Sequence, residues 1–116
     1  MGSRVRHFGV GDAVLGFGPA SFANRVITKD TALTHLPSGL SFEAGATIPT
    51  VFFTVYYSLR HLAHLDVGEK ILIHGAAGGV GIAAIQFAQW IGAEIHATAG
   101  SDAKRDFLRQ IGRAHV

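Results

Sequence analysis

The chain has 116 residues, enough for one modest core or for part of a larger one. Hydrophobic residues make up 48% and charged residues 16%, which excludes a disordered or coiled-coil chain. The net charge is only +2 and the basic residues are scattered, so we expect no nucleic-acid partner. No cysteine is present, which excludes disulfides and thiolate metal sites. Without a long apolar run or a signal-peptide core, we expect a cytoplasmic protein with no membrane partner.

The first part of the chain is predicted to form β structure with turns. Residues 13–16 are typical of a strand, and a glycine-rich bend over 16–20 leads to a second extended run over 22–28. A turn is predicted at residues 11–12 and a loop at 36–39. We therefore expect residues 1–48 to be the C-terminal part of a β-rich domain.

Two helices are predicted next. Ser41 is a suitable N-cap for a short helix over 42–46, and Pro49 is suited to open a second helix. The second helix carries a broad apolar stripe formed by Val51, Phe52, Val55, Tyr56, Leu59 and Leu62. At least half of the aromatic residues Phe52, Phe53, Tyr56 and Tyr57 are expected to pack in a core. A turn at 66–68 then precedes the next strand.

A strand, a glycine turn and a helix follow in that order. Residues 70–74 form an unbroken aliphatic run, residues 75–78 are the turn, and apolar residues recur at helical spacing over 79–91. Gly92 stands where a C-terminal cap belongs, and a second strand is predicted over 94–98. This order is typical of an α/β dinucleotide-binding fold, so residues 49–116 are predicted to be the N-terminal part of such a domain.

The turn is the predicted cofactor site. Its pattern is Ala76-x-Gly78-x-x-Gly81, a variant of GxGxxG with alanine in the first glycine's place. Backbone amides and a helix N-terminus would meet there at a pyrophosphate. The predicted cradle consists of Ala76, Ala77, Gly78, Gly79, Val80 and Gly81. The alternative is a strand–turn–helix with a structural role only.

The residues after the second strand bear on cofactor choice. Thr98, Ala99 and Gly100 stand where an NAD-preferring enzyme usually has an acidic residue. Ser101 is a suitable N-cap for a helix over 102–109, with Phe107 and Leu108 expected to face inward. Lys104 lies in the first turn of that helix, where the helix dipole disfavours a cation unless an anion is bound. Ser101 and Lys104 therefore predict a 2′-phosphate contact and NADP(H); the alternative is that Lys104 is an ordinary solvated lysine.

Three histidines are candidate ligands of a metal or a cofactor. His61 and His64 have a spacing that could ligate a metal, but a surface pair is the better interpretation, and no metal site is predicted. His74 adjoins the glycine turn and could touch a cofactor. A hydrogen-bonding role at the strand end is the preferred interpretation.

Several segments, in this order, resemble the medium-chain dehydrogenase/reductase superfamily: residues 10–16, the predicted strand at 22–23, and residues 36–43, 48–49, 54–57 and 75–81. Within it, the chain is most similar to the zinc-free quinone-reductase branch and closest to the enoyl reductase domains of polyketide synthases. The resemblance implies a partial doubly wound Rossmann-type nucleotide domain preceded by the β-rich tail of a GroES-like catalytic domain.

The same resemblance implies a function. NADP(H) would deliver hydride to an α,β-unsaturated acyl thioester held on an acyl carrier protein or CoA, without a metal, in a homodimeric parent protein. It places the Thr54 hydroxyl near the nicotinamide; the alternative is a helix threonine that bonds its own backbone. No catalytic acid is assigned. Two rival functions remain, a free-standing NADPH quinone or enal reductase and a non-catalytic cofactor-binding pseudo-reductase module.

The last six residues, 111–116, form the sequence IGRAHV, which a common sequencing adapter would encode. We therefore expect that the natural chain departs near Gln110, that the chain is truncated and that the fragment is inactive alone. Family members also tend to have Leu-Gly-Ala at this point, which leaves a natural origin open.

Overall fold

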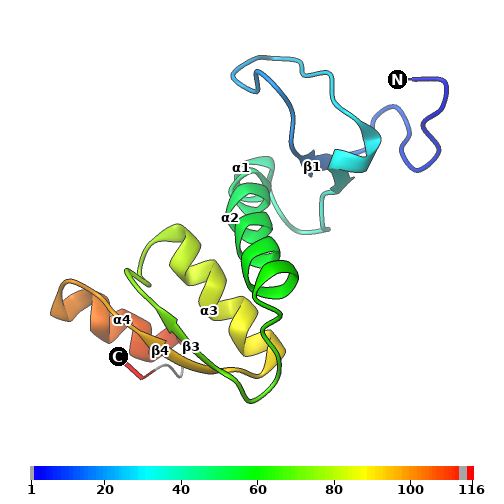
Figure 1. Ribbon diagram of the computed structural model, residues 1–116. Coiled ribbons are helices and arrows are strands. Elements are labelled where there is room, and N and C mark those ends of the chain that lie inside the picture. Colours follow the sequence, from blue (N-terminus) through cyan, green and yellow to red (C-terminus); the bar gives the residue numbers. More distant parts are fainter. Residues whose placement is uncertain (1, 113–114) are drawn as a thin grey trace. The chain divides into compact units, whose positions relative to one another are not determined.

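The computed structural model describes residues 2–112 and 115–116 and divides the chain into two compact units, Met1–Thr50 and Val51–Val116. Figure 1 shows the order of the elements along the chain. The predicted domain boundary between residues 48 and 49 stays a prediction, because a compact unit need not be a domain. Part of the predicted non-native tail, residues 113–114, lies outside the described residues.

The first unit contains a small antiparallel sheet and a short helix. Strands β1 (Val14–Gly16) and β2 (Leu33–His35) pair, and a 3₁₀ turn, η1 (Asp30–Ala32), leads into β2. Helix α1 (Phe42–Ala46) begins as predicted, because the Ala44 N–H donates to the Ser41 side chain over 3.2 Å. The predicted strand at 13–16 is confirmed by β1.

The predicted extended run over residues 22–28 is wrong as a strand, since no strand is assigned there. Phe22 is fully exposed and Ile27 nearly so. The run is held at its end, where the Thr28 hydroxyl donates to the Phe17 carbonyl over 2.7 Å. Apolar and β-branched residues form a strand only beside a partner strand, and none of the described strands pairs with this run. Strand β2, only three residues long, was not predicted from the sequence.

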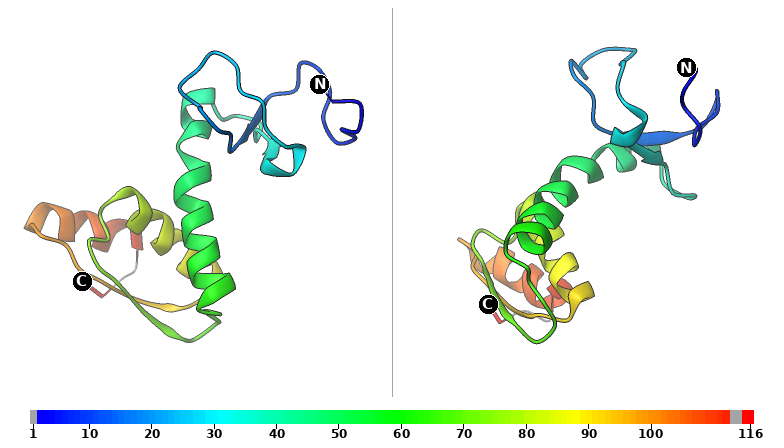
Figure 2. Two further views of the ribbon diagram at one scale, coloured as in Figure 1. Left: turned by 45° about the horizontal axis from the view of Figure 1, so that its top comes forward. Right: turned by 45° about the vertical axis from the view of Figure 1, so that its right-hand side comes forward.

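The second unit is built on a parallel pair of strands. Strands β3 (Lys70–Ile73) and β4 (Glu94–Ala97) pair with Ile73 opposite Ala97. Helix α3 (Gly79–Ile91) connects them and packs on the sheet, and Figures 1 and 2 show the two strands side by side. Gly92 ends α3 with a φ of 89°, as predicted. The predicted strand–turn–helix–strand order is confirmed.

Helix α4 (Asp102–Gly112) follows β4 and contacts α3. Leu108 is completely buried, whereas Phe107 is 42% exposed, so the prediction that both face inward is correct only for Leu108. Adjacent helical residues point about 100° apart, and the face of α4 that packs inward is centred on Leu108. On the edge of β4 that does not pair with β3, the His115 N–H donates to the Ile95 carbonyl over 2.9 Å.

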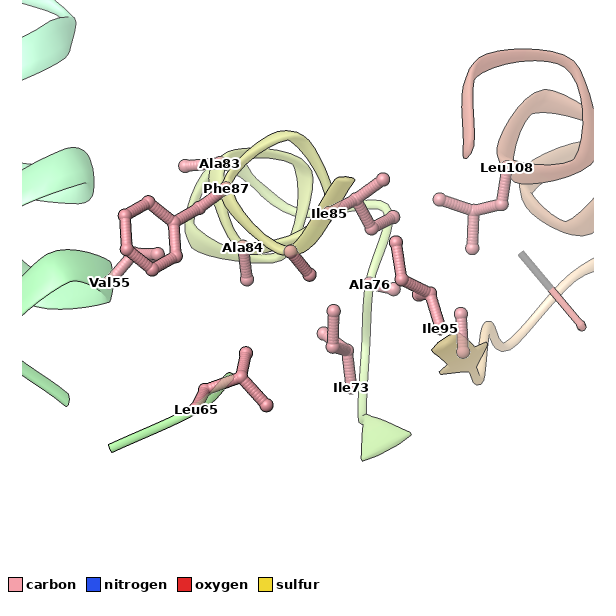
Figure 3. Close-up of a cluster of buried hydrophobic side chains, with 12 residues drawn as sticks. Val55, Leu65, Ile73, Ala76, Ala83, Ala84, Ile85, Phe87, Ile95 and Leu108 are labelled. Carbon is pink, nitrogen blue, oxygen red and sulfur yellow. The ribbon is translucent and has the colours of Figure 1, made fainter. Parts of the chain in front are cut away.

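The core of the second unit lies between α3 and the sheet (Figure 3). Alanines on α3 let the helix approach the strands closely, and larger aliphatic side chains fill the space around them. The buried residues are Val55, Leu65, Ile73, Ala76, Ala83, Ala84, Ile85, Phe87, Ala88, Ile95, Ala97 and Leu108. This shared core holds α3 against β3 and β4, and the glycine turn connects β3 to α3.

Helix α2 (Ile48–Val55) continues into a π-helix, η2 (Tyr56–Leu62). Val55 is buried, as the apolar stripe predicts, but Tyr56 and Leu62 are exposed. The wider helix changes the register, since the Ala63 N–H donates to the Ser58 carbonyl five residues back. Val51, Phe52 and Leu59 pack against the core, so the predicted stripe is confirmed except at Tyr56 and Leu62.

The aromatic prediction for this helix is wrong. At least half of four aromatic residues were expected in the core, yet Phe53, Tyr56 and Tyr57 are 45–56% exposed. Phe53 stacks on Tyr57 with ring centroids 6.0 Å apart, and Tyr57 stacks on His61 at 5.0 Å. Phe53 and Tyr57 therefore pack along the helix surface, whereas Tyr56 meets the core residue Phe87 edge-on with ring centroids 5.9 Å apart. No helix in the described part is long and apolar enough to cross a membrane.

Candidate functional site

The glycine turn, residues 75–78, follows β3 at the carboxyl end of the parallel sheet. Gly75 has a φ of 61°, in the left-handed region that favours glycine, and the Gly78 N–H donates to the Gly75 carbonyl over 3.1 Å. A Cβ at Gly75 would meet nothing within 4 Å, and one at Gly78 would meet only the Gly75 carbonyl oxygen at 3.6 Å. The outer surface of the turn is therefore open backbone.

Gly81 lies on the inner side of this turn. A Cβ there would come within 2.5 Å of the Ala76 carbonyl oxygen and 2.6 Å of the Ala76 Cα. Because these atoms are backbone, they cannot move aside as a flexible side chain can. The first turn of α3 can therefore pack against the glycine turn only with glycine at this position.

Four backbone amides at this point have no hydrogen-bond partner among the described residues: those of Ala77, Gly79, Val80 and Gly81. The first helical bond of α3 is made by the Ile82 N–H, which donates to the Gly78 carbonyl over 2.8 Å. Free amides at a helix N-terminus carry partial positive charge and favour a bound anion. The arrangement can therefore hold phosphate oxygens.

Ala76 differs from the other predicted cradle residues. It is completely buried, and its N–H donates to the Thr98 carbonyl over 2.9 Å. Its amide is thus already paired and cannot bind a ligand. Ala76 contributes by packing under Gly81 and by joining the turn to the end of β4.

Thr98 links the turn to β4 through both its backbone and its side chain. Its N–H donates to the Ile73 carbonyl over 3.0 Å, and its Oγ1 accepts the Gly75 N–H over 3.2 Å. His74 Nδ1 lies 3.1 Å from the same oxygen, so the hydrogen-bonding role expected for His74 is confirmed. From the sequence, Thr98 was expected only to leave the end of the second strand uncharged. Its position just after a strand parallel to the strand of the turn was the signal for this second role.

A pocket of about 240 Å³ lies beside the turn, within the second unit. It brings together Thr54, His74 and Val80, which come from three separate segments of the chain. Most of its remaining walls are aliphatic, including Leu59 and Ile71. Apolar walls with a few hydroxyl and imidazole groups suit a flat, partly polar ring. Thr54 is thus placed near the turn, and its contact with a cofactor stays a prediction.

Ser101 and Lys104 lie in the loop and first helical turn after β4. The Ser101 Oγ accepts the Lys104 N–H over 3.4 Å, as expected for an N-cap. The exposed Lys104 ammonium has no ion-pair partner within the described ranges. Arg105, by contrast, donates to the Ala99 carbonyl over 2.9 Å and pairs with Asp102. Of these two cations, Lys104 is the one available to a ligand.

The two parts of the predicted site share one edge of the sheet. The glycine turn follows Ile73 and the loop to Ser101 follows Ala97, and these two strand residues are opposite each other. Ligands of parallel α/β sheets bind outside the carboxyl ends of the strands. The structure therefore gathers the predicted residues of the second unit at one edge, and their binding of a cofactor remains to be tested.

The carboxyl groups with altered pKa values lie away from the glycine turn. A hydrogen bond from His96, at 2.9 Å, and the nearby Lys70 ammonium lower the pKa of Glu94, which begins β4. The Gly9 N–H and His35 lower the pKa of Asp12. In the described part of the chain, no three His, Asp or Glu side chains are grouped to hold a metal. Because the carboxyl groups with altered pKa values lie away from the glycine turn, neither is assigned as a catalytic acid.

Comparison with known proteins gives a consistent set of relatives. The chain is 46% identical over 108 residues to the highly reducing polyketide synthase claI of Penicillium crustosum. It superposes on the CurK enoyl reductase with a TM-score of 0.80 and 39% identity, over 95% of this chain. A quinone oxidoreductase of Pseudomonas syringae gives a TM-score of 0.83 and 37% identity, over 98% of this chain. No family model matches.

The match covers little of each relative. The chain spans 5% of the polyketide synthase, 33% of the CurK enoyl reductase and 35% of the quinone oxidoreductase. These structural relatives are oxidoreductases by name, and the likeness to them extends over both compact units.

Proposed function

We propose that this chain, which belongs to the medium-chain dehydrogenase/reductase superfamily, is part of an NADPH-dependent, zinc-free enoyl reductase domain. The observation that carries the proposal is the set of free amides at Ala77, Gly79, Val80 and Gly81, beside a turn that is open at Gly75 and Gly78. Such amides favour anions in general, and their place between two parallel strands, after a glycine turn, suits the linked phosphates of a dinucleotide.

The residues present fit a dinucleotide. The open surface at Gly75 and Gly78 admits phosphate oxygens close to the backbone, and the amides neutralise their charge. Lys104, with Ser101 beside it, would hold a 2′-phosphate by a charge-assisted contact. Thr54 would position the nicotinamide from the wall of the pocket. When bound, NADPH supplies the hydride; these residues bind and orient it.

We further propose that the acceptor is an α,β-unsaturated acyl thioester on an acyl carrier protein or CoA. The polyketide synthase relatives support this substrate class. The reaction would transfer hydride to the β-carbon and a proton to the α-carbon, in a parent protein that we expect to be a homodimer. The proton donor is not among the residues assigned here.

Two rival functions remain. A free-standing quinone or enal reductase is favoured by the similarity to the quinone oxidoreductase. A pseudo-reductase module would keep the fold and the cofactor site without turnover. All three functions would use the glycine turn to bind the cofactor. They differ in whether a hydride acceptor reacts and in which acceptor it is.

One experiment separates these functions. The completed domain, expressed from the parent gene, is mixed with NADPH and a crotonyl thioester, a quinone or a free enal, and NADPH absorbance is followed. Oxidation with the thioester supports the proposal. Oxidation only with the quinone or enal indicates the free-standing reductase, and binding without oxidation indicates the pseudo-reductase. A domain that does not bind NADPH would overturn all three.

A further inference from the structure

His74 and Thr98 stand just after neighbouring parallel strands, and their side chains meet beside the glycine turn. His74 Nδ1 lies 3.1 Å from Thr98 Oγ1, and the Gly75 N–H donates to the same oxygen over 3.2 Å. The second ring nitrogen of His74, Nε2, has no hydrogen-bond partner within residues 2–112 and 115–116. Both side chains are exposed, so this nitrogen is accessible to a ligand.

The hydrogen bonds of Thr98 favour one position for the imidazole proton of His74. An amide N–H can only donate, so Thr98 Oγ1 accepts from Gly75 and still has one hydrogen to give. Nδ1 of His74 is the one acceptor for that hydrogen among the described residues. If the hydroxyl donates to Nδ1, the neutral ring must carry its proton on Nε2. The Gly75 N–H, the Thr98 hydroxyl and His74 Nδ1 then all have hydrogen-bond partners, and the His74 Nε2–H has none among the described residues.

We propose that Thr98 is a positioning residue that holds His74 in the Nε2–H tautomer, and that His74 donates this N–H to an oxygen of the bound dinucleotide. This inference rests on the proposed function, because it requires a dinucleotide at the glycine turn. It adds a side-chain donor to a site otherwise made of backbone amides. Thr98 acts through His74 and does not itself touch the ligand.

The placement of His74 supports this role. It adjoins Gly75 on one side and forms part of the 240 Å³ pocket on the other, together with Thr54 and Val80. The Val80 amide is one of the four free donors, so a ligand held there passes close to the imidazole. A pyrophosphate oxygen and the carboxamide oxygen of nicotinamide both accept hydrogen bonds. The shared chemistry is an oxygen acceptor, and the two sources can be separated experimentally.

The first test needs no ligand. Nitrogen-15 NMR of the histidine rings reports the tautomer of His74 in the 116-residue chain at about pH 8, where a free imidazole is neutral. We expect the Nε2–H form in the wild type and in Thr98→Ser, which keeps the hydroxyl, and its loss in Thr98→Val. An Nδ1–H tautomer in the wild type, or an unchanged spectrum in Thr98→Val, would overturn the positioning role.

The second test measures binding by the completed domain to NADP⁺ and to 2′-phospho-ADP-ribose, which is NADP⁺ without its nicotinamide. His74→Ala and Thr98→Val should each weaken NADP⁺ binding about three- to tenfold, as expected for one hydrogen bond, and Thr98→Ser should bind nearly as the wild type. Equal losses for both ligands identify a phosphate contact, and a loss confined to NADP⁺ identifies the carboxamide. Either result supports the inference.

The two proposals fail in different ways. If the wild type binds NADP⁺ and both variants bind it equally well, the role of His74 is overturned and the proposed function stands. If the wild type binds neither ligand, the proposed function fails, and the ligand contact of His74 fails with it.

Discussion

Gly81 lies against the backbone of Ala76 so closely that a Cβ on Gly81 would stand 2.5 Å from the Ala76 carbonyl oxygen. This contact sets the start of α3 directly under the glycine turn. The free amides of the first helical turn therefore lie beside the glycine turn.

Gly81→Ala is therefore expected to destabilise the fold. Adding a methyl group against fixed backbone should cost about 1–3 kcal/mol of unfolding free energy, as overpacking does. The matched control is Gly78→Ala, because a Cβ there meets only the Gly75 carbonyl oxygen at an ordinary 3.6 Å. Urea denaturation of both variants measures the difference. Equal stability of the two would contradict the close contact.

Lys104 is expected to select the phosphorylated cofactor. Lys104→Ala should weaken NADPH binding about 5- to 30-fold, because a charge-assisted contact is lost, and should leave NADH nearly unchanged. Arg109→Ala is the control, since Arg109 lies on the same helix and pairs with Asp106 over 2.7 Å. Titration of the completed domain with both cofactors measures the effect. Equal losses for NADPH and NADH would reject the 2′-phosphate contact.

Leu108 and Phe107 are expected to differ strongly in their contribution to stability. Leu108→Ala removes a completely buried side chain and should cost about 2–5 kcal/mol, whereas Phe107→Ala acts on a residue that is 42% exposed and should cost less. Thermal or urea unfolding of the two variants tests the packing of α4. A larger loss for Phe107→Ala would mean that α4 presents the other face to the core.

Glu94 is expected to contribute to the acid sensitivity of the fold. Hydrogen bonding from His96 and the charge of Lys70 lower its pKa from the ordinary 4.5, so its carboxylate is favoured in the folded state. This stabilisation is fully present above pH 4.5 and is lost as the pH falls through the lower, folded-state pKa.

Glu94→Gln removes that titration. The variant should therefore be less stable than the wild type near neutral pH, and the difference should shrink as the pH falls below 4.5. Unfolding midpoints measured across this range check the prediction. A difference that does not depend on pH would show that the interactions of Glu94 with His96 and Lys70 carry no net stabilisation.

The second unit could be predicted well from sequence because local signals agree there. The caps at Ser101 and Gly92, the aliphatic strand and the small residues of α3 all specify the same order of elements. The run over 22–28 could not be predicted, because whether it pairs depends on a partner strand and not on its own composition.

Helix register and side-chain networks set a second limit. α2 changes to a π-helix at Tyr56, and the two residues of the predicted stripe that are exposed, Tyr56 and Leu62, both lie in that π-helix. For the candidate site, the glycine turn followed from a motif, whereas the link between Thr98 and His74 joins residues 24 apart in the sequence. Spacing within one segment carries no signal for such a contact.

The central claim is that the amides of the glycine turn and of the first turn of α3 hold a dinucleotide. Amide chemical shifts of the ¹⁵N-labelled chain during titration with NADP⁺ test it most directly. We expect the largest shifts at Ala77, Gly79, Val80 and Gly81, and a small shift at Ala76, whose amide is already paired with Thr98. Saturable shifts located elsewhere, or no shifts at all, would contradict the account.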